Sequence, residues 1–178
     1  DKDLEKKINK DIIEMESMLN SYLDYARTQT DEKSSEINIK KFISEVVKQH
    51  LNKNQIAIIF ELSYENQKIF GKENALKRCF NNVINNAFDH AHYLEINIKQ
   101  SNSGLSIIFA DNGPGVEPEE YKNILKPFYR LDKSRSLNNK GVGLGLSIVE
   151  DIIKSHGGNI IFSKSHLGGL SIKLFFPF

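Results

Sequence analysis

The stretch KGVGLGLSIVEDIIKSHGG, residues 140–158, constrains the fold of this chain most strongly. It places glycines at 141, 143 and 145 and continues without a break into an apolar, helix-like segment. Such a turn presents unpaired backbone N–H groups and the positive end of a helix dipole, which suit a phosphate group that side chains would hold away. Lys140, with Lys133 and Arg135 upstream, supplies cations for a polyphosphate. Taken alone, the motif fits a tight turn into a helix without any ligand equally well.

The composition limits the remaining possibilities. With 178 residues, 39% of them hydrophobic, the chain can bury one good core. The formal net charge of +1 predicts no nucleic-acid partner. The single cysteine, Cys79, excludes an intrachain disulfide and is interpreted as a small buried residue. No apolar run approaches the roughly 18 residues that span a bilayer, so we expect this stretch not to cross a membrane. Because it opens on DKDLEKK, with helical character and no methionine, we expect it to be part of a longer protein.

The first 30 residues predict one long helix that packs against other helices. Its apolar positions follow at steps of 4, 3, 4, 3 and 4, and three further residues widen this seam beyond a two-stranded stripe, as in a four-helix bundle. The seam residues are Ile8, Ile12, Met15, Leu19, Tyr22 and Ala26, widened by Ile13, Met18 and Leu23. The alternative is that this helix packs on its own domain. The polar run 27–36 lacks periodicity, so we place a linker at 31–36 and a second domain at 37–178.

The second domain predicts an α+β fold, a two-layer sandwich in which a mixed sheet is covered by helices on one face. Helices are expected at 40–51, at about 73–91, near 118–125 and after the glycines at 141–145. Strands are expected in INI, IAIIFEL, KIFG, YLEINIK, LSIIFAD, NIIFSK and LSIKLFF.

The segment FADNGPGV, residues 109–116, ends an apolar strand in Asp111, with Gly113 and Gly115 behind it. A buried carboxylate there can accept a hydrogen bond from the exocyclic amine of adenine, whereas guanine would present its O6 acceptor. This pattern would select ATP over GTP. An ordinary Asp-Asn-Gly turn is the alternative.

The predicted helix CFNNVINNAFDHA carries Asn82 and Asn86 four residues apart, so both amides lie on one face. Asparagine is a poor helix former, so this repetition needs a reason. An amide oxygen is a ligand suited to Mg²⁺, which also takes phosphate oxygens. Codon preference in a low-GC genome explains Asn81 and Asn85 well enough.

In combination, NNVINNAFDHA, DNGPGV, KPFYRLDKSRS, GVGLGLSIV and GGLSIKLFFP resemble the ATP-binding domain of sensor histidine kinases, within the wider family of gyrase-, chaperone- and mismatch-repair-type ATPases. INKDIIEMESMLNSYLDYAR is similar to the second helix of the kinase dimerisation and histidine-phosphotransfer hairpin. The whole run most resembles osmosensor-type kinases that pair with winged-helix response regulators of the OmpR class. The resemblance implies the ATP-binding fold of that family, a homodimer in the full-length kinase, and the cytoplasmic portion of an inner-membrane-anchored bacterial sensor.

The resemblance also implies roles for individual residues. Asn86 would hold Mg²⁺, and Asn82, the catalytic position, would stand where the ATPase relatives have a water-activating glutamate. Asp111 would bind adenine, with Gly113 and Gly115 against the base and His90 beside the nucleotide, although His90 also fits a plain helix-end histidine. The remaining nucleotide-binding positions would be Phe128 and Arg130 at the lid, Arg135 and Lys140 at the phosphates, and Gly141, Val142, Gly143, Leu144, Gly145 and Leu146 in the turn.

Three departures bear on function. The family usually has Lys or Arg where this chain has Asp89, and often Thr or Ser at Val142. Asp89 would repel the phosphates, unless it points to water or caps the helix. None of the five histidines has the surroundings of a phosphoacceptor, so we expect the acceptor upstream of Asp1. The alternatives are an anti-sigma-factor-like serine kinase, an ATP hydrolase, or a non-catalytic dimerisation and nucleotide-sensing module.

Overall fold

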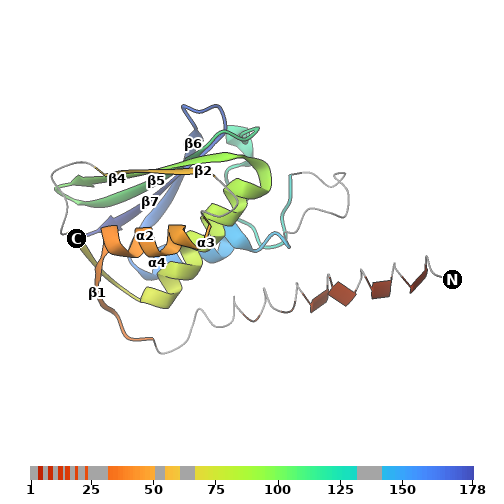
Figure 1. Ribbon diagram of the computed structural model, residues 1–178, viewed down its shortest axis with the longest axis horizontal. Helices are drawn as coiled ribbons and strands as arrows, with labels where there is room; N and C mark the ends of the chain where they lie inside the picture. The colour runs from red at the N-terminus through yellow and green to blue at the C-terminus, as the bar shows by residue number, and fades with distance from the viewer. Residues whose placement is uncertain are drawn as a thin grey trace.

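The computed structural model describes residues 32–50, 55–60, 67–131 and 142–178, together with ten residues between 4 and 23 (Figure 1). Its larger sheet has the strand order β2-β4-β5-β7-β6. Strand β2 (Gln55–Phe60) runs parallel to β4 (Tyr93–Ser101), and all other neighbours are antiparallel. The remaining strands are β5 (Gly104–Asp111), β6 (Asn159–Lys164) and β7 (Leu170–Pro177). The helices lie together on one face of this sheet, which confirms the predicted two-layer α+β fold with a mixed sheet.

Alternation along the strands explains why one face is covered. In β4, Leu94, Ile96 and Ile98 are buried, whereas Lys99 on the opposite face is exposed. The register pairs Ile96 with Phe109 of β5 on the buried face. Because strand side chains alternate with a period of two, a single register fits the covered face.

Three helices form the second layer. The first is α2 (Ile39–Lys48), whose cap residue Asn38 accepts a hydrogen bond from the Lys41 amide at 3.0 Å. It buries Phe42, Ile43, Val46 and Val47 on one face. Helix α3 (Glu73–His90) ends within one residue of its predicted end, and α4 (Gly145–Ser155) begins at the last glycine of the turn.

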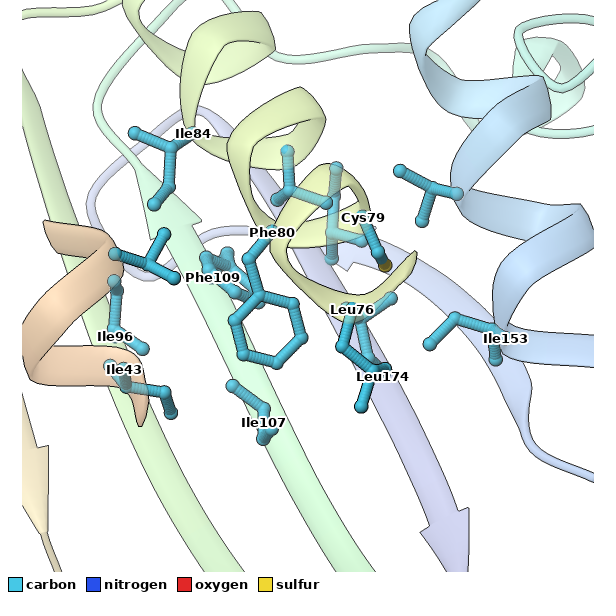
Figure 2. Close-up of a cluster of buried hydrophobic side chains, with 14 of the residues drawn as sticks. Ile43, Leu76, Cys79, Phe80, Ile84, Ile96, Ile107, Phe109, Ile153 and Leu174 are labelled. Carbon is cyan, nitrogen blue, oxygen red and sulfur yellow. The ribbon is translucent and has the colours of Figure 1, made fainter. Parts of the chain in front are cut away.

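The core lies between these helices and the sheet. Phe80 of α3 contacts Phe42 and Phe109 edge to face, with ring centroids 5.3 and 5.6 Å apart. Figure 2 shows Phe80 among aliphatic residues of α2, α3 and the central strands. Cys79 is fully buried beside it, and burial raises the pKa of its thiol well above the usual range. The interpretation of Cys79 as a small buried residue is therefore confirmed.

A small antiparallel sheet pairs β1 (Ser35–Asn38) with β3 (Lys68–Gly71), so β1 begins inside the range expected to be a linker. The helix predicted near 118–125 is wrong. Only the 3₁₀ turn η2 (Pro118–Glu120) forms, and turns follow it. Its amides bond three residues back, as Glu120 N does to Glu117 O at 2.9 Å, and Pro127 prevents a helix from continuing.

The ten described residues between 4 and 23 are all helical and exposed. They include Ile8, Ile12, Met15 and Leu19 of the predicted seam and Ile13 and Leu23 beside it, with exposed fractions of 41 to 69%. The seam positions Met18, Tyr22 and Ala26 lie outside the described residues. Of the helices in the described ranges, none is both long and apolar enough to span a membrane.

Candidate functional site

A cavity of about 790 Å³ opens between α3, the end of β5 and the start of α4. It brings together polar residues of α3, the carboxylate that ends β5, backbone of the glycine-rich turn and residues beside the 3₁₀ turn. Of the predicted site residues, it is lined by Asn82, Asn86, His90, Asp111, Gly115, Arg130, Val142, Gly143, Leu144, Gly145 and Leu146.

Asp111 is held rigidly at one end of this cavity. Its side chain is 7% exposed, and its Oδ1 accepts hydrogen bonds from the Gly113 amide at 2.8 Å and the Leu170 amide at 3.1 Å. Its Oδ2 has no hydrogen-bond partner among the described residues. A rigid, buried acceptor with one oxygen available suits an amino group on a flat ring. The alternative of a plain turn carboxylate does not explain why β7 donates to it.

Glycines make this arrangement possible. A Cβ at Gly169 would collide with Asp111 Oδ1, and a Cβ at Gly113 would lie 3.0 Å from that oxygen and from the His90 carbonyl. Gly113 does not line the cavity itself but packs the loop against the end of α3. Gly115 has φ +77°, which favours glycine.

Along α3, Arg78, Asn82 and Asn86 recur at intervals of four residues and all line the cavity. Asp89 and His90 line it at the end of the helix and are exposed there. The 111–115 loop packs on this same end, because the Gly113 Cβ position lies 3.0 Å from the His90 carbonyl. Asp111 and the last residues of α3 thus form one end of the site.

Helix α4 begins at the other end. A Cβ at Gly145 would lie 3.6 Å from Asn82 Oδ1, so the first turn of α4 lies beside Asn82. Leu144 precedes this helix without a side-chain cap, and the first turn carries no acidic residue. The Ile148 amide donates the first hydrogen bond of the helix, to Leu144 O at 3.0 Å. The amides of 145–147 before it have no acceptor within the helix. Leu144 and Leu146, on either side of Gly145, are both buried.

Gly143 is required for a reason other than a ligand. Its φ is +80°, and a Cβ there would lie 2.9 Å from the Tyr129 carbonyl. Its own carbonyl accepts a hydrogen bond from the Phe128 amide at 2.9 Å, and Phe128 itself has φ +64°. This contact joins the two described ends of the 128–143 segment. At Gly145 a Cβ would make only ordinary contact with Asn82, so the fold alone does not require glycine there, and the exclusion of side chains by phosphate stays a prediction for Gly145.

Next to this junction, the Tyr129 hydroxyl donates to Glu120 Oε2 at 2.6 Å. That hydrogen bond raises the pKa of Tyr129, and together with a second one from the Asn123 side-chain amide at 3.1 Å it lowers the pKa of Glu120. Both residues line the cavity. The hydrogen bond between Tyr129 and Glu120 holds residues 128–131, which we call the lid root, against the loop after η2.

The predicted site residues differ in where they lie. Phe128 is 64% exposed and does not line the cavity, because its left-handed backbone turns it out and its amide makes the contact. Arg135, Lys140 and Gly141 lie outside the described residues. Sequence reasoning missed Arg78, Glu120 and Tyr129. The signals were present: Arg78 lies four residues before Asn82, and Tyr129 follows directly after Phe128.

The donor set suits a magnesium nucleotide better than a resident metal centre. Among the described residues, no group of three or more His, Cys, Asp or Glu side chains could hold a metal ion. The cavity instead offers amide oxygens from Asn82 and Asn86. Mg²⁺ commonly takes few protein ligands and completes its shell with water and phosphate oxygens, so these residues fit it.

Comparison with known proteins agrees with this geometry. Residues 71–178 match the family model described as "Histidine kinase-, DNA gyrase B-, and HSP90-like ATPase". The chain is 38% identical over 110 residues to the sensor histidine kinase CpxA of Escherichia coli K12, covering 61% of this chain and 24% of that protein. It is 31% identical over 179 residues to the sensor protein RstB of the same strain, covering 96% of this chain and 40% of that protein. The chain therefore spans less than half the length of these two relatives.

Among solved structures, the histidine kinase domain of the E. coli osmosensor EnvZ superposes with a TM-score of 0.60 at 25% identity. The superposition covers 84% of this chain and 90% of that domain.

Proposed function

Because the chain belongs to the family of histidine kinase-, DNA gyrase B- and HSP90-like ATPases, we propose that it is the ATP-binding catalytic part of a two-component sensor histidine kinase. It transfers the γ-phosphoryl group of ATP to a histidine on a helix that this sequence does not contain, for relay to a response-regulator aspartate. The family membership and the relatedness to sensor kinases bear out the resemblance seen in the sequence. The roles of individual residues remain part of the proposal.

The observation that carries the proposal is the separation of two recognition elements across one cavity. Asp111 offers a buried acceptor at the β5 end, which matches the exocyclic amine of adenine. The uncapped first turn of α4, beside Asn82, offers amides and a helix dipole at the other end, which match phosphate. ATP fits with its base at Asp111 and its phosphates at α4.

The residues between these two ends would bind Mg²⁺ and orient the phosphates. Asn86 would hold Mg²⁺, which supplies charge neutralisation for the phosphates when it is bound. Asn82 orients the phosphates but is a poor base because its amide does not take up a proton at neutral pH. An amide at this position, where the ATPase relatives have a glutamate, favours transfer to an incoming histidine over hydrolysis. This argues against the rival of an ATP hydrolase.

The acceptor histidine must come from elsewhere. Three of the five histidines make contacts within the domain. His50 bonds Asn81 at 2.8 Å, His156 Nε2 accepts from the Lys72 amide at 3.0 Å, and His166 lies 3.5 Å from Glu95. His90 and His92 are at and just beyond the end of α3. Because none of the five has the sequence surroundings of a phosphoacceptor, we place the acceptor outside this sequence.

We also propose the larger context. The exposed apolar side chains at Ile8, Ile12, Met15 and Leu19 suit a helical bundle, and hence a homodimer in the full-length kinase. A response regulator is the partner of a two-component kinase, and the winged-helix OmpR class is our proposal for it. The chain would be the cytoplasmic portion of an inner-membrane-anchored sensor. A serine kinase or a nucleotide-sensing module that transfers no phosphate is the alternative.

A transfer assay separates these functions. The chain is mixed with Mg²⁺, γ-labelled ATP and a polypeptide that carries the acceptor hairpin of its own kinase, and the label is followed in the hairpin. Acid-labile, alkali-stable label on the hairpin, lost when its histidine is replaced, is expected. Acid-stable label would indicate a serine kinase. Bound ATP without any transfer would indicate a sensing module, and release of phosphate without labelling would indicate a hydrolase.

A further inference from the structure

The relative orientation of α3 and α4 fixes which end of α3 faces the phosphates. At one end, the Lys72 amide before α3 donates to His156, which follows α4, at 3.0 Å. The opposite end of α4, at Gly145, lies beside Asn82 in the middle of α3. The two helices are therefore antiparallel. The unpaired amides of α4 are level with Asn82, not with the end of α3.

Arg78 lies one turn from Asn82 on the same face of α3 and also lines the cavity. Four residues advance a helix by about 6 Å, which is within the reach of an arginine side chain. Arg78 is half-buried in this wall of the cavity. Asp89 is seven residues beyond Asn82, roughly 10 Å in the opposite direction.

The charges along the described wall of the cavity are unevenly distributed. Its acidic residues are Asp89, Asp111, Glu117 and Glu120, and its arginines are Arg78 and Arg130. Of the two arginines, Arg130 is on the exposed lid root and Arg78 is on α3. A magnesium triphosphate beside Asn82 retains negative charge, and a planar guanidinium is suited to bind phosphate oxygens in pairs.

We propose that Arg78 is a phosphate-binding residue that contacts the terminal phosphates of ATP and makes the site select triphosphate over monophosphate. This rests on the proposed function, because it assumes that an adenine nucleotide occupies the cavity. Under this proposal, the positive charge at the phosphates comes from the turn of α3 that precedes Asn82. The Asp89 carboxylate lies at the other end of the cavity, where the adenine base would bind.

Binding of AMP and of a non-hydrolysable ATP analogue, both with Mg²⁺, tests this by calorimetry. Arg78→Gln should weaken binding of the analogue by about tenfold to a hundredfold and change binding of AMP by less than about twofold. Arg78→Lys should recover part of the loss. Lys77→Gln is the matched control, because Lys77 is the neighbouring cation, pairs with Glu73 at 2.8 Å and does not line the cavity.

A second measurement follows Arg78 by NMR in the parent protein itself. The Nε–H resonance of Arg78 in the parent protein, assigned with the Arg78→Lys spectrum, should shift with the ATP analogue and not with AMP. Equal loss of AMP and analogue binding in Arg78→Gln, or an Arg78 resonance that ignores the analogue, would overturn the proposal. If the parent binds neither nucleotide, the proposed function fails as well. If the parent binds both and only the Arg78 results are negative, the inference alone fails.

Discussion

Replacing Asp111 with asparagine exchanges one carboxylate oxygen for an amino group and leaves the shape of the side chain unchanged. The amide oxygen can keep both hydrogen bonds that Oδ1 now accepts, from Gly113 N at 2.8 Å and from Leu170 N at 3.1 Å. The amino group then takes the place of Oδ2. It would point a donor at the exocyclic amine of adenine, which is also a donor.

The expected loss of ATP affinity is that of one hydrogen bond. Loss of a hydrogen bond to a charged acceptor costs about 1.5–3 kcal/mol, which weakens ATP binding roughly tenfold to a hundredfold. GTP presents the O6 acceptor at that place, so the ratio of ATP to GTP affinity should fall. Asp111→Ala differs because it leaves the buried Leu170 amide and the partly buried Gly113 amide without an acceptor, at about 1–3 kcal/mol in the free energy of unfolding for the buried one.

Calorimetric titration with ATP and GTP at one Mg²⁺ concentration, together with denaturant unfolding, measures both effects. Asp151→Asn, an exposed aspartate on α4, is the matched control and should change neither. The reasoning is refuted if Asp111→Asn binds ATP as the parent does. It is also refuted if Asp111→Asn loses as much unfolding free energy as Asp111→Ala, because the carboxylate would then act on the fold alone.

Four further changes test other parts of the site. Asn86→Ala should weaken Mg·ATP binding and abolish transfer to the acceptor hairpin, whereas Asn82→Ala should reduce transfer more than binding, as a transfer assay beside calorimetry would measure. Gly143→Ala places a side chain at φ +80° and 2.9 Å from the Tyr129 carbonyl. This should cost about 1–2 kcal/mol locally and speed hydrogen exchange of the Phe128 amide about fivefold to thirtyfold. Tyr129→Phe should lower thermal stability at neutral pH but not at acidic pH. The hydroxyl depresses the pKa of its carboxylate partner, so the contribution of this pair is lost as the pH falls through that depressed value.

Each of these has a matched control or a contrary result. Asn74→Ala, an exposed position on α3, should bind and transfer as the parent does. Parent-like transfer by the Asn86 variant would remove that residue from the metal site. Unchanged exchange at Phe128 would mean that its bond to Gly143 does not hold the lid root. A Tyr129→Phe stability loss that persists at acidic pH would show that Glu120 is not its relevant partner.

Much of the fold follows from local pattern. The alternation of Leu94, Ile96 and Ile98 predicts a half-buried strand, and the apolar face of 39–48 predicts α2. Both follow because strand and helix periodicity place the apolar side chains on one face, which can then be buried. The predicted helix near 118–125 failed because the segment forms a single 3₁₀ turn at Pro118–Glu120 and then continues as turns up to Pro127, which has no N–H to extend a helix.

The site could be predicted only in part. The order of motifs placed Asp111, Asn82 and Asn86 in one site, since each follows or forms a regular element. What Gly143 contacts could not be foreseen, because its partner Tyr129 is 14 positions away and meets it only through a left-handed residue at Phe128. The place of Arg78 likewise depends on α4 running antiparallel to α3, which no local pattern encodes.

The central claim is that one cavity binds the adenine of ATP at Asp111 and its phosphates at the start of α4. Amide chemical shifts of the isotopically labelled chain, followed by NMR during titrations with adenosine and with a non-hydrolysable ATP analogue, test this most directly. Adenosine should shift the amides of Gly113 and Leu170 alone, and the analogue should shift these and also the amides of 145–147. Shifts at 145–147 with adenosine alone, or none at Gly113 and Leu170 with either ligand, would contradict the account.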